Sequence, residues 1–155
     1  MSTTPTNRME LLRKMPVFGG LSNDTLVYID ENSPSISAAK DEFFFREGAQ
    51  ADSLYVIQSG TVVVLKRWRD GDVEIGRMGP GDCFGEMAIV DLEVRSASIQ
   101  AAEDCMAIQI DRQILHGIFK DNLEQYAIIM MNMGREISRR LRTVSDRLFE
   151  LERAE

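Results

Sequence analysis

Residues Phe84 to Ala97 read FGEMAIVDLEVRSA, and the interpretation of the whole chain starts from this stretch. Glu86 and Arg95 stand nine positions apart in it, with a mostly apolar connector between them. A fixed carboxylate accepts hydrogen bonds from sugar hydroxyls, and a guanidinium binds phosphate through a planar, two-pronged set of donors. Gly85 can adopt backbone angles that are closed to other residues and lets a ligand approach closely. The stretch therefore suits a nucleotide that carries a single phosphate.

Around this stretch, the segment from Ser35 to Ile110 consists of short apolar runs separated by glycine turns. The runs are rich in β-branched and aromatic residues, which favour strands, and Asp70-Gly71 indicates a tight hairpin. Several short strands at this spacing predict a sandwich or jelly-roll barrel. The expected strands are Phe43 to Phe45, Ser53 to Gln58, Thr61 to Lys66, Val73 to Met78, Ala97 to Ala101 and Met106 to Ile110.

The N-terminal part of the chain reads as helical. Residues 1–7 are polar, and we expect them to be disordered. The segment from Arg8 to Met15 predicts a short amphipathic helix that ends because Pro16 follows it. Ser22 is the expected N-cap of a second helix. Residues 8–34 thus form a predicted helical lead-in to the strands.

The chain becomes helical again at its C-terminal end, residues 111–155. Asp111 is the expected N-cap of a short helix that runs to about Phe119, and Asp121 or Asn122 is expected to start a long one. Along the long helix, apolar or small residues recur at alternating spacings of three and four, which is a heptad pattern. Its members are Ala127, Met130, Gly134, Ile137, Leu141, Val144, Leu148 and Leu151.

This pattern predicts a parallel coiled coil that joins two copies of the chain through residues 127–151. The alternative is that the stripe packs only against its own barrel. The arginines that flank the stripe are expected to be solvated, since the chain as a whole is acidic. They are Arg135, Arg139, Arg140, Arg142 and Arg147.

Composition narrows the functional class. The chain has 155 residues, 44% of them hydrophobic and 28% charged, which is typical of one globular domain. A net charge of −7 argues against a broad surface for DNA. Cys83 and Cys105 lie in apolar runs and are expected to be reduced core thiols in a cytoplasmic protein. The sequence has neither an apolar run of membrane-spanning length nor an apolar signal core at its start.

The stretch from Phe84 to Ala97 closely resembles the phosphate-binding cassette of the cyclic nucleotide-binding domain family. This family includes catabolite-activator-type regulators, regulatory parts of protein kinases, and gated channels. FGEMA and RSA match the family pattern, while Val94 stands where many members have proline. The resemblance implies an α+β fold, a β-roll (jelly-roll barrel) at residues 35–110 with N-terminal helices and a long C-terminal helix. It covers about residues 8 to 150 and implies a bacterial-type, stand-alone member without a DNA-binding domain.

The resemblance also implies roles for individual residues. Glu86 matches the glutamate that accepts the ribose 2′-hydroxyl, and Arg95 matches the arginine that pairs with the cyclic phosphate. Ser96 would add a hydroxyl bond to the phosphate, and Ala97 completes the motif. Backbone N–H groups around Gly85, Met87 and Ala88 would complete the cradle, and Val64 and Ile75 align with apolar positions of the base pocket.

On the long helix, the resemblance assigns Arg140, Val144 and Ser145 to the ligand. Val144 replaces a threonine whose hydroxyl reads the base in the catabolite activator, so the base preference stays open. We expect cAMP ahead of cGMP, and a cyclic dinucleotide is a further option. Ser145 would act from its own chain or from the partner subunit.

Other functional classes fit the sequence less well. A jelly-roll metal enzyme normally uses two or more histidines, and this chain has only His116, which lies in the helical part. We therefore expect no enzyme activity, no metal and no cofactor. The expected function is a sensor that acts on an unknown effector protein through its C-terminal helix. The alternative is a ligand-free dimeric interaction module with a degenerate pocket.

Overall fold

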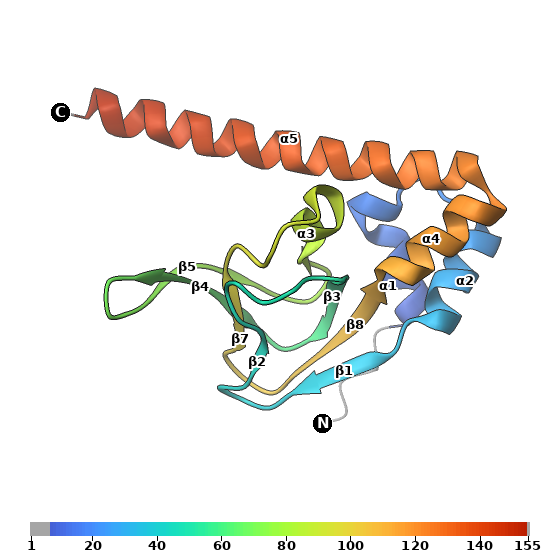
Figure 1. The fold of residues 1–155 in the computed structure, drawn as a ribbon, viewed down its shortest axis with the longest axis horizontal. Helices are drawn as coiled ribbons and strands as arrows, with labels where there is room; N and C mark the ends of the chain where they lie inside the picture. Colours follow the sequence, from blue (N-terminus) through green and yellow to red (C-terminus); the bar gives the residue numbers. More distant parts are fainter. Residues whose placement is uncertain (1–6, 155) are drawn as a thin grey trace.

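The computed structural model describes residues 7–154, apart from the side chain of Ala88. Its strands form two antiparallel four-stranded sheets that make a roll, with most of the helices gathered at one end (Figure 1). The predicted α+β fold, a β-roll with N-terminal helices and a long C-terminal helix, is confirmed. The strands are β1 (Ser35–Ala38), β2 (Phe43–Phe45), β3 (Ser53–Ser59), β4 (Val62–Trp68), β5 (Gly71–Met78), β6 (Cys83–Phe84), β7 (Ser98–Ala101) and β8 (Cys105–Asp111).

One sheet has the strand order β1-β8-β3-β6 and the other β2-β7-β4-β5. The prediction placed six of these strands in the right segments but missed β1 and β6. Both missed strands are short, and β6 runs directly into the cassette. Their strand form depends on pairing with β8 and β3, which are distant in sequence, so local residue preference does not show it.

The central strands of the first sheet are buried on both faces. Along β3, Leu54 and Val56 face the helices, whereas Tyr55 and Ile57 face the interior of the roll. Successive side chains point to opposite faces of a strand, so one strand serves two cores. One core lies inside the roll, and the other lies between this sheet and the helices.

The hairpin between β4 and β5 forms where it was predicted, but its turn lies one residue earlier. Trp68 pairs with Gly71, so Arg69 and Asp70 are the two loop residues. Arg69 has a φ of 56°, in the left-handed region that a tight hairpin turn requires. Gly71 is the first residue of β5 instead, because the strand pairing and not the glycine sets the register.

The described helical elements are α1 (Arg8–Lys14), the 3₁₀ turn η1 (Pro16–Phe18), α2 (Asn23–Asn32), α3 (Glu86–Asp91), α4 (Arg112–Asp121) and α5 (Leu123–Arg153). Helices α2, α4 and α5 begin at predicted caps, whereas α3 lies in the stretch that was predicted only as a connector. Ser22, Asp111 and Asn122 each accept a hydrogen bond from a backbone N–H in the first turn of α2, α4 and α5. Asn7, which the prediction placed in a disordered segment, caps α1 by accepting from Met9 N–H. Residues 1–6 lie outside the described residues.

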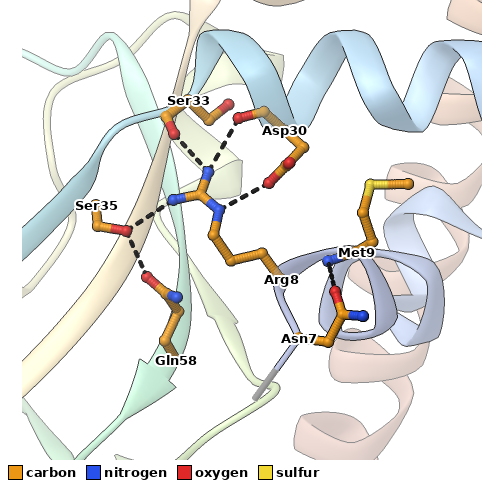
Figure 2. Close-up of polar contacts among 7 residues, drawn as sticks. All are labelled: Asn7, Arg8, Met9, Asp30, Ser33, Ser35 and Gln58. Atoms are coloured by element: carbon orange, nitrogen blue, oxygen red, sulfur yellow. Dashed lines mark hydrogen bonds and ion pairs between the residues drawn. The ribbon is translucent and has the colours of Figure 1, made fainter. Parts of the chain in front are cut away.

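Arg8 fastens the N-terminal helix to the rest of the molecule (Figure 2). Its Nε donates to Asp30 Oδ1 at 2.7 Å, and its Nη2 donates to the carbonyls of Ser33 at 2.5 Å and Asp30 at 3.1 Å. Its Nη1 donates to Ser35 Oγ at 2.7 Å, and that hydroxyl donates to Gln58 on β3. The carbonyls at the end of α2 receive donors in this way, which a helix C-terminus otherwise lacks.

Helix α5 starts among the other helices and then extends past them along the side of the roll (Figure 1). Its first half is anchored: Ile129 and Met133 are buried, and Asn132 Nδ2 donates to the carbonyls of Val17 and Gly19. Every residue from 138 to 154 is exposed. Of the predicted heptad members, Leu141, Val144, Leu148 and Leu151 are all more than half exposed, so this part of the stripe has no cover within the described chain.

Both cysteines are buried and free, as predicted. Among the described residues, no helix is long and apolar enough to cross a membrane.

Candidate functional site

The cassette folds as a strand end, a glycine turn and a short helix. β6 pairs with β3, with Phe84 opposite Tyr55, and Gly85 follows at a φ of +87°. A Cβ on Gly85 would lie 2.7 Å from Arg95 Nη1 and 3.1 Å from the Ser53 carbonyl oxygen. Both the backbone angle and the lack of space therefore require glycine here. Glu86, the next residue, is the first residue of α3.

Arg95 lies inside the roll with only 4% of its surface exposed. Its Nη2 donates to the Ser53 carbonyl at 2.8 Å and its Nη1 to the Gly85 carbonyl at 3.2 Å. The guanidinium carbon lies 4.0 Å from the centre of the Phe45 ring, which covers one face of the cation. Burial lowers the pKa of Arg95 from its ordinary value. The guanidinium therefore holds a charge in a site where charge is costly to keep.

The partners of Arg95 are incomplete. Its Nε is buried and has no hydrogen-bond partner among the described residues, and the two carbonyls that receive its Nη1 and Nη2 are neutral. Within residues 7–154, it forms no ion pair with a carboxylate. Its backbone is fixed in place, because Arg95 N–H donates to Ala49 and Gly48 N–H donates to the Arg95 carbonyl. A buried, fixed cation without an anion is a feature that points to an anionic ligand.

Glu86 is 1% exposed and carries two contacts. Arg140 Nη1, from α5, donates to Glu86 Oε1. The Cys83 thiol lies 3.9 Å from Oε2. Burial, and next the charge of Glu86, raise the pKa of Cys83 well above its ordinary value, so the thiol keeps its proton and donates toward the carboxylate. One buried carboxylate thus links the cassette to the long helix.

Arg95 and Glu86 face one cavity of about 320 Å³. Its walls come from β2, β4, β5, β6, α3, the connector before β7, β7, and Arg140 on α5. The lining residues are Phe45, Val64, Ile75, Met78, Cys83, Phe84, Gly85, Glu86, Met87, Asp91, Glu93, Val94, Arg95, Ser96, Ala97, Ile99 and Arg140. The volume falls in the range of small-molecule sites, and the wall is mostly apolar with a few convergent charges.

Most residues singled out from the sequence meet at this cavity. Gly85, Met87, Ser96, Ala97, Val64 and Ile75 line it together with the three charged residues Glu86, Arg95 and Arg140. Ala88 lies in α3 beside them, and its side chain is outside the described set.

Two singled-out residues do not reach the cavity within one chain. Val144 and Ser145 follow Arg140 by about one turn of α5 and are exposed. In this part of the helix the roll no longer covers the residues. The assignment of Val144 and Ser145 to the ligand therefore stays a prediction.

Sequence reasoning missed several wall residues. Phe45, whose ring covers Arg95, and Ile99 belong to strands that were predicted, but the side chains that each strand meets across the cavity were not. Asp91 and Glu93 were passed over because they were treated as part of a connector. Cys83 was identified only as a core thiol.

Comparison with known proteins places this geometry in a family. The sequence profile of the cyclic nucleotide-binding domain matches residues 35–122, more than half of the chain. A CRP-like cAMP-activated global transcriptional regulator of Mycobacterium tuberculosis is 29% identical over 143 residues, which cover 92% of this chain and 62% of the regulator. A cGMP-dependent protein kinase of Drosophila melanogaster is 29% identical over 120 residues, covering 75% of this chain and 13% of the kinase. The chain therefore spans less than two thirds of the length of either relative.

Solved structures agree with the sequence match. A cyclic nucleotide-binding domain from Methylobacillus flagellatus superposes with a TM-score of 0.80 at 26% identity, covering 92% of this chain and 81% of that one. The glycine turn, the two buried charges and the cavity lining other than Arg140 thus lie within residues 35–122, the matched region. The chain belongs to the cyclic nucleotide-binding domain family.

Proposed function

We propose that this protein is a sensor that binds a cyclic nucleotide, cAMP in preference to cGMP, and passes the binding event to an effector protein through α5. The observation that carries the proposal is Arg95: a buried cation with an unpaired Nε that faces the same cavity as a buried carboxylate. The family of the chain supports a cyclic nucleotide as the ligand.

Arg95 is the proposed phosphate-binding residue. Its present acceptors are the neutral carbonyls of Ser53 and Gly85. Hydrogen bonds between a guanidinium and a phosphate oxygen are charge-assisted and roughly twice as strong as neutral ones. The exocyclic oxygens of a cyclic phosphate would therefore compete well for the same N–H groups. Ser96, exposed at the cavity wall, would add a hydroxyl donor.

Glu86 is the proposed acceptor for the ribose 2′-hydroxyl. As a buried carboxylate it accepts strongly, and its position is fixed by Arg140 on one oxygen and by the thiol of Cys83 near the other. Arg140 leaves part of the acceptor capacity of Glu86 free, because a carboxylate has about four lone-pair sites. A 2′-hydroxyl can donate to one of them.

The base is proposed to lie against Val64 and Ile75. Val64 is half-buried, whereas Ile75 is 60% exposed although it lines the cavity. A planar base would cover such an apolar side chain and gain from removing it from water. Val144 offers no hydroxyl for base recognition. The proposed preference for cAMP therefore rests on the hydroxyl of Ser145, the residue after Val144, which the family resemblance assigns to the ligand.

Arg140 gives the proposed route from ligand to output. It is the contact between α5 and Glu86, so a ligand that changes the hydrogen bonding of Glu86 also changes what holds α5. The exposed stripe from Leu141 to Leu151 is the proposed seam with a second copy of the chain, since it has heptad spacing. Coupling between a ligand site and such a helix is typically worth about 1–3 kcal/mol.

Calorimetric titration of nucleotide-free protein with cAMP and then cGMP tests the proposal. Dissociation constants of roughly micromolar or tighter, equivalent to about −8 kcal/mol, are expected for cAMP and weaker ones for cGMP. Absence of heat and of thermal stabilisation with both nucleotides would contradict the proposal and support a dimeric interaction module or another ligand, such as a cyclic dinucleotide. Light scattering with and without ligand reports the dimer in the same samples.

A further inference from the structure

The last residue of α3 and the connector that follows it, residues 92–94, place two carboxylates at the cavity. Asp91 and Glu93 both line it, and both are exposed. We propose that Asp91 and Glu93 are specificity-determining residues that disfavour nucleotides with more than one negative charge, the noncyclic mono-, di- and triphosphates, relative to a cyclic monophosphate. This inference rests on the proposed function and extends it to the choice between ligands.

The balance of charge around the cavity supports the proposal. The charged lining residues are three acids, Glu86, Asp91 and Glu93, and two arginines, Arg95 and Arg140. Arg140 is paired with Glu86. Among the described lining residues, Arg95 is therefore the one cation left for an anionic ligand, and it is accompanied by two acids that have no basic partner within ion-pair distance.

One further cation lies nearby. Lys66 Nζ donates to the Ser96 carbonyl at 2.6 Å, but it also lies 3.4 Å from Glu47 Oε1. Glu47 offsets its charge, and Lys66 is not part of the cavity lining. The cavity thus holds one buried positive charge, with unpaired negative charge at its exposed wall.

The backbone holds this connector in a defined shape. Glu93 N–H donates to Asp91 Oδ1 at 2.9 Å, and Leu92 between them has a φ of 60°. Two residues later, Arg95 N–H is bonded to the Ala49 carbonyl. The acids therefore keep a fixed place relative to Arg95. An independent feature of the same cavity, the buried and unpaired Nε of Arg95, indicates that an anion belongs there.

Elementary electrostatics gives the expected selectivity. A cyclic phosphate carries one negative charge, which Arg95 can neutralise, whereas a phosphate monoester carries about −1.5 to −2 at neutral pH. Each additional negative charge about 8 Å from a carboxylate in water weakens binding roughly twofold. This penalty adds up along the series from monophosphate to triphosphate, and it is screened at high ionic strength.

The test is the double variant Asp91→Asn with Glu93→Gln, which keeps side-chain shape and leaves an amide oxygen at position 91 that can accept from the N–H of residue 93. Affinities for cAMP, 5′-AMP, ADP and ATP are measured by competition against a fluorescent cyclic nucleotide, at about 10 mM and about 0.5 M salt. We expect the variant to gain affinity at low salt in the order of ligand charge. The gain in 5′-AMP affinity should exceed the gain in cAMP affinity by about fourfold at most, and the ATP gain should be larger. At high salt the gains should nearly vanish.

The matched control is Glu31→Gln with Glu124→Gln, which removes the same charge from exposed positions on α2 and α5 that do not line the cavity. An equal gain for all ligands, or the same graded gain in the control, overturns the proposal, because net charge alone would explain it. Wild-type protein that binds neither cyclic nucleotide overturns the proposed function as well. If the wild-type protein binds cAMP but the affinity gains of the double variant do not rise with the charge of the ligand, this inference alone is overturned.

Discussion

The two ends of the proposed ligand site are built differently. At the phosphate and ribose end, Arg95 and Glu86 are 4% and 1% exposed. Two backbone carbonyls and the Phe45 ring hold Arg95, and the ion pair with Arg140 holds Glu86. At the base end, Ile75 and Val144 are 60% and 53% exposed. The first end is part of the core and forms whenever the roll folds. The second depends on the ligand, on a movement of α5, or on a second chain.

This difference predicts where substitutions act. Changes at the buried end should alter ligand affinity strongly and often the free energy of unfolding as well, because the same atoms would bind the ligand and pack within the fold. Changes at the exposed end should alter selectivity with little effect on the free energy of unfolding. The following experiments test this division, beginning with the largest expected effect.

Arg95→Ala should lower affinity for cAMP by about 100-fold or more, since it removes the charge-assisted bonds to the phosphate. The control is Arg77→Ala, which removes an exposed arginine that forms an ion pair with Glu74 on the same strand. Titration calorimetry measures both, and circular dichroism checks the fold. Near wild-type affinity in the Arg95 variant would remove the phosphate assignment.

Glycine substitution compares the two regions directly. Gly85→Ala should destabilise the fold by roughly 1–3 kcal/mol, because the new Cβ meets Arg95 and Ser53 at a positive φ. Gly134→Ala, in α5, should instead stabilise by roughly 0.5–1 kcal/mol, because a Cβ there would meet no described atom within 4 Å beyond its chain neighbours and the backbone of its own helix. Urea unfolding at fixed protein concentration gives both values. Destabilisation by Gly134→Ala would mean that α5 packs closely against something at this position, as a second copy would.

Sequence alone located the buried end well, for a physical reason. The glycine turn, the acid and the arginine lie within one short segment, so their types and spacing carry most of the chemistry. What the sequence did not show is what holds them: the Ser53 carbonyl is 42 residues from Arg95, and Phe45 reaches it only through sheet pairing. Such contacts depend on register, which a few local residues do not determine.

At the exposed end, the sequence predicted the helix itself but not what covers it. The heptad spacing correctly predicted a long helix with an apolar stripe, and the stripe beyond Ile137 is exposed. The same periodicity does not specify whether a barrel, a ligand or another chain covers it. The hairpin turn at Arg69 and Asp70 is a smaller case, in which strand pairing moved the turn by one residue.

Glu86→Gln should lower affinity for cAMP by about tenfold and reduce discrimination against 2′-deoxy-cAMP, because a neutral amide accepts more weakly than a carboxylate. It also weakens the contact with Arg140, so Arg140→Ala is measured alongside. The Arg140 variant should lower affinity for both ligands by similar factors. Equal losses for cAMP and its 2′-deoxy analogue in the Glu86 variant would count against the ribose role.

Val144→Thr tests the base end with the smallest change. The side chains have nearly the same shape, and Val144 is exposed, so the free energy of unfolding should change by less than about 0.5 kcal/mol. If α5 covers the base in the bound state, the new hydroxyl should strengthen cAMP binding by roughly threefold to tenfold, the worth of one added hydrogen bond. The matched control, Val73→Thr, adds a hydroxyl at an exposed valine of β5 outside the cavity lining. A gain that appears only above the concentration at which the protein dimerises would assign the covering helix to the partner subunit, and no gain at any concentration would leave base recognition to Val64 and Ile75.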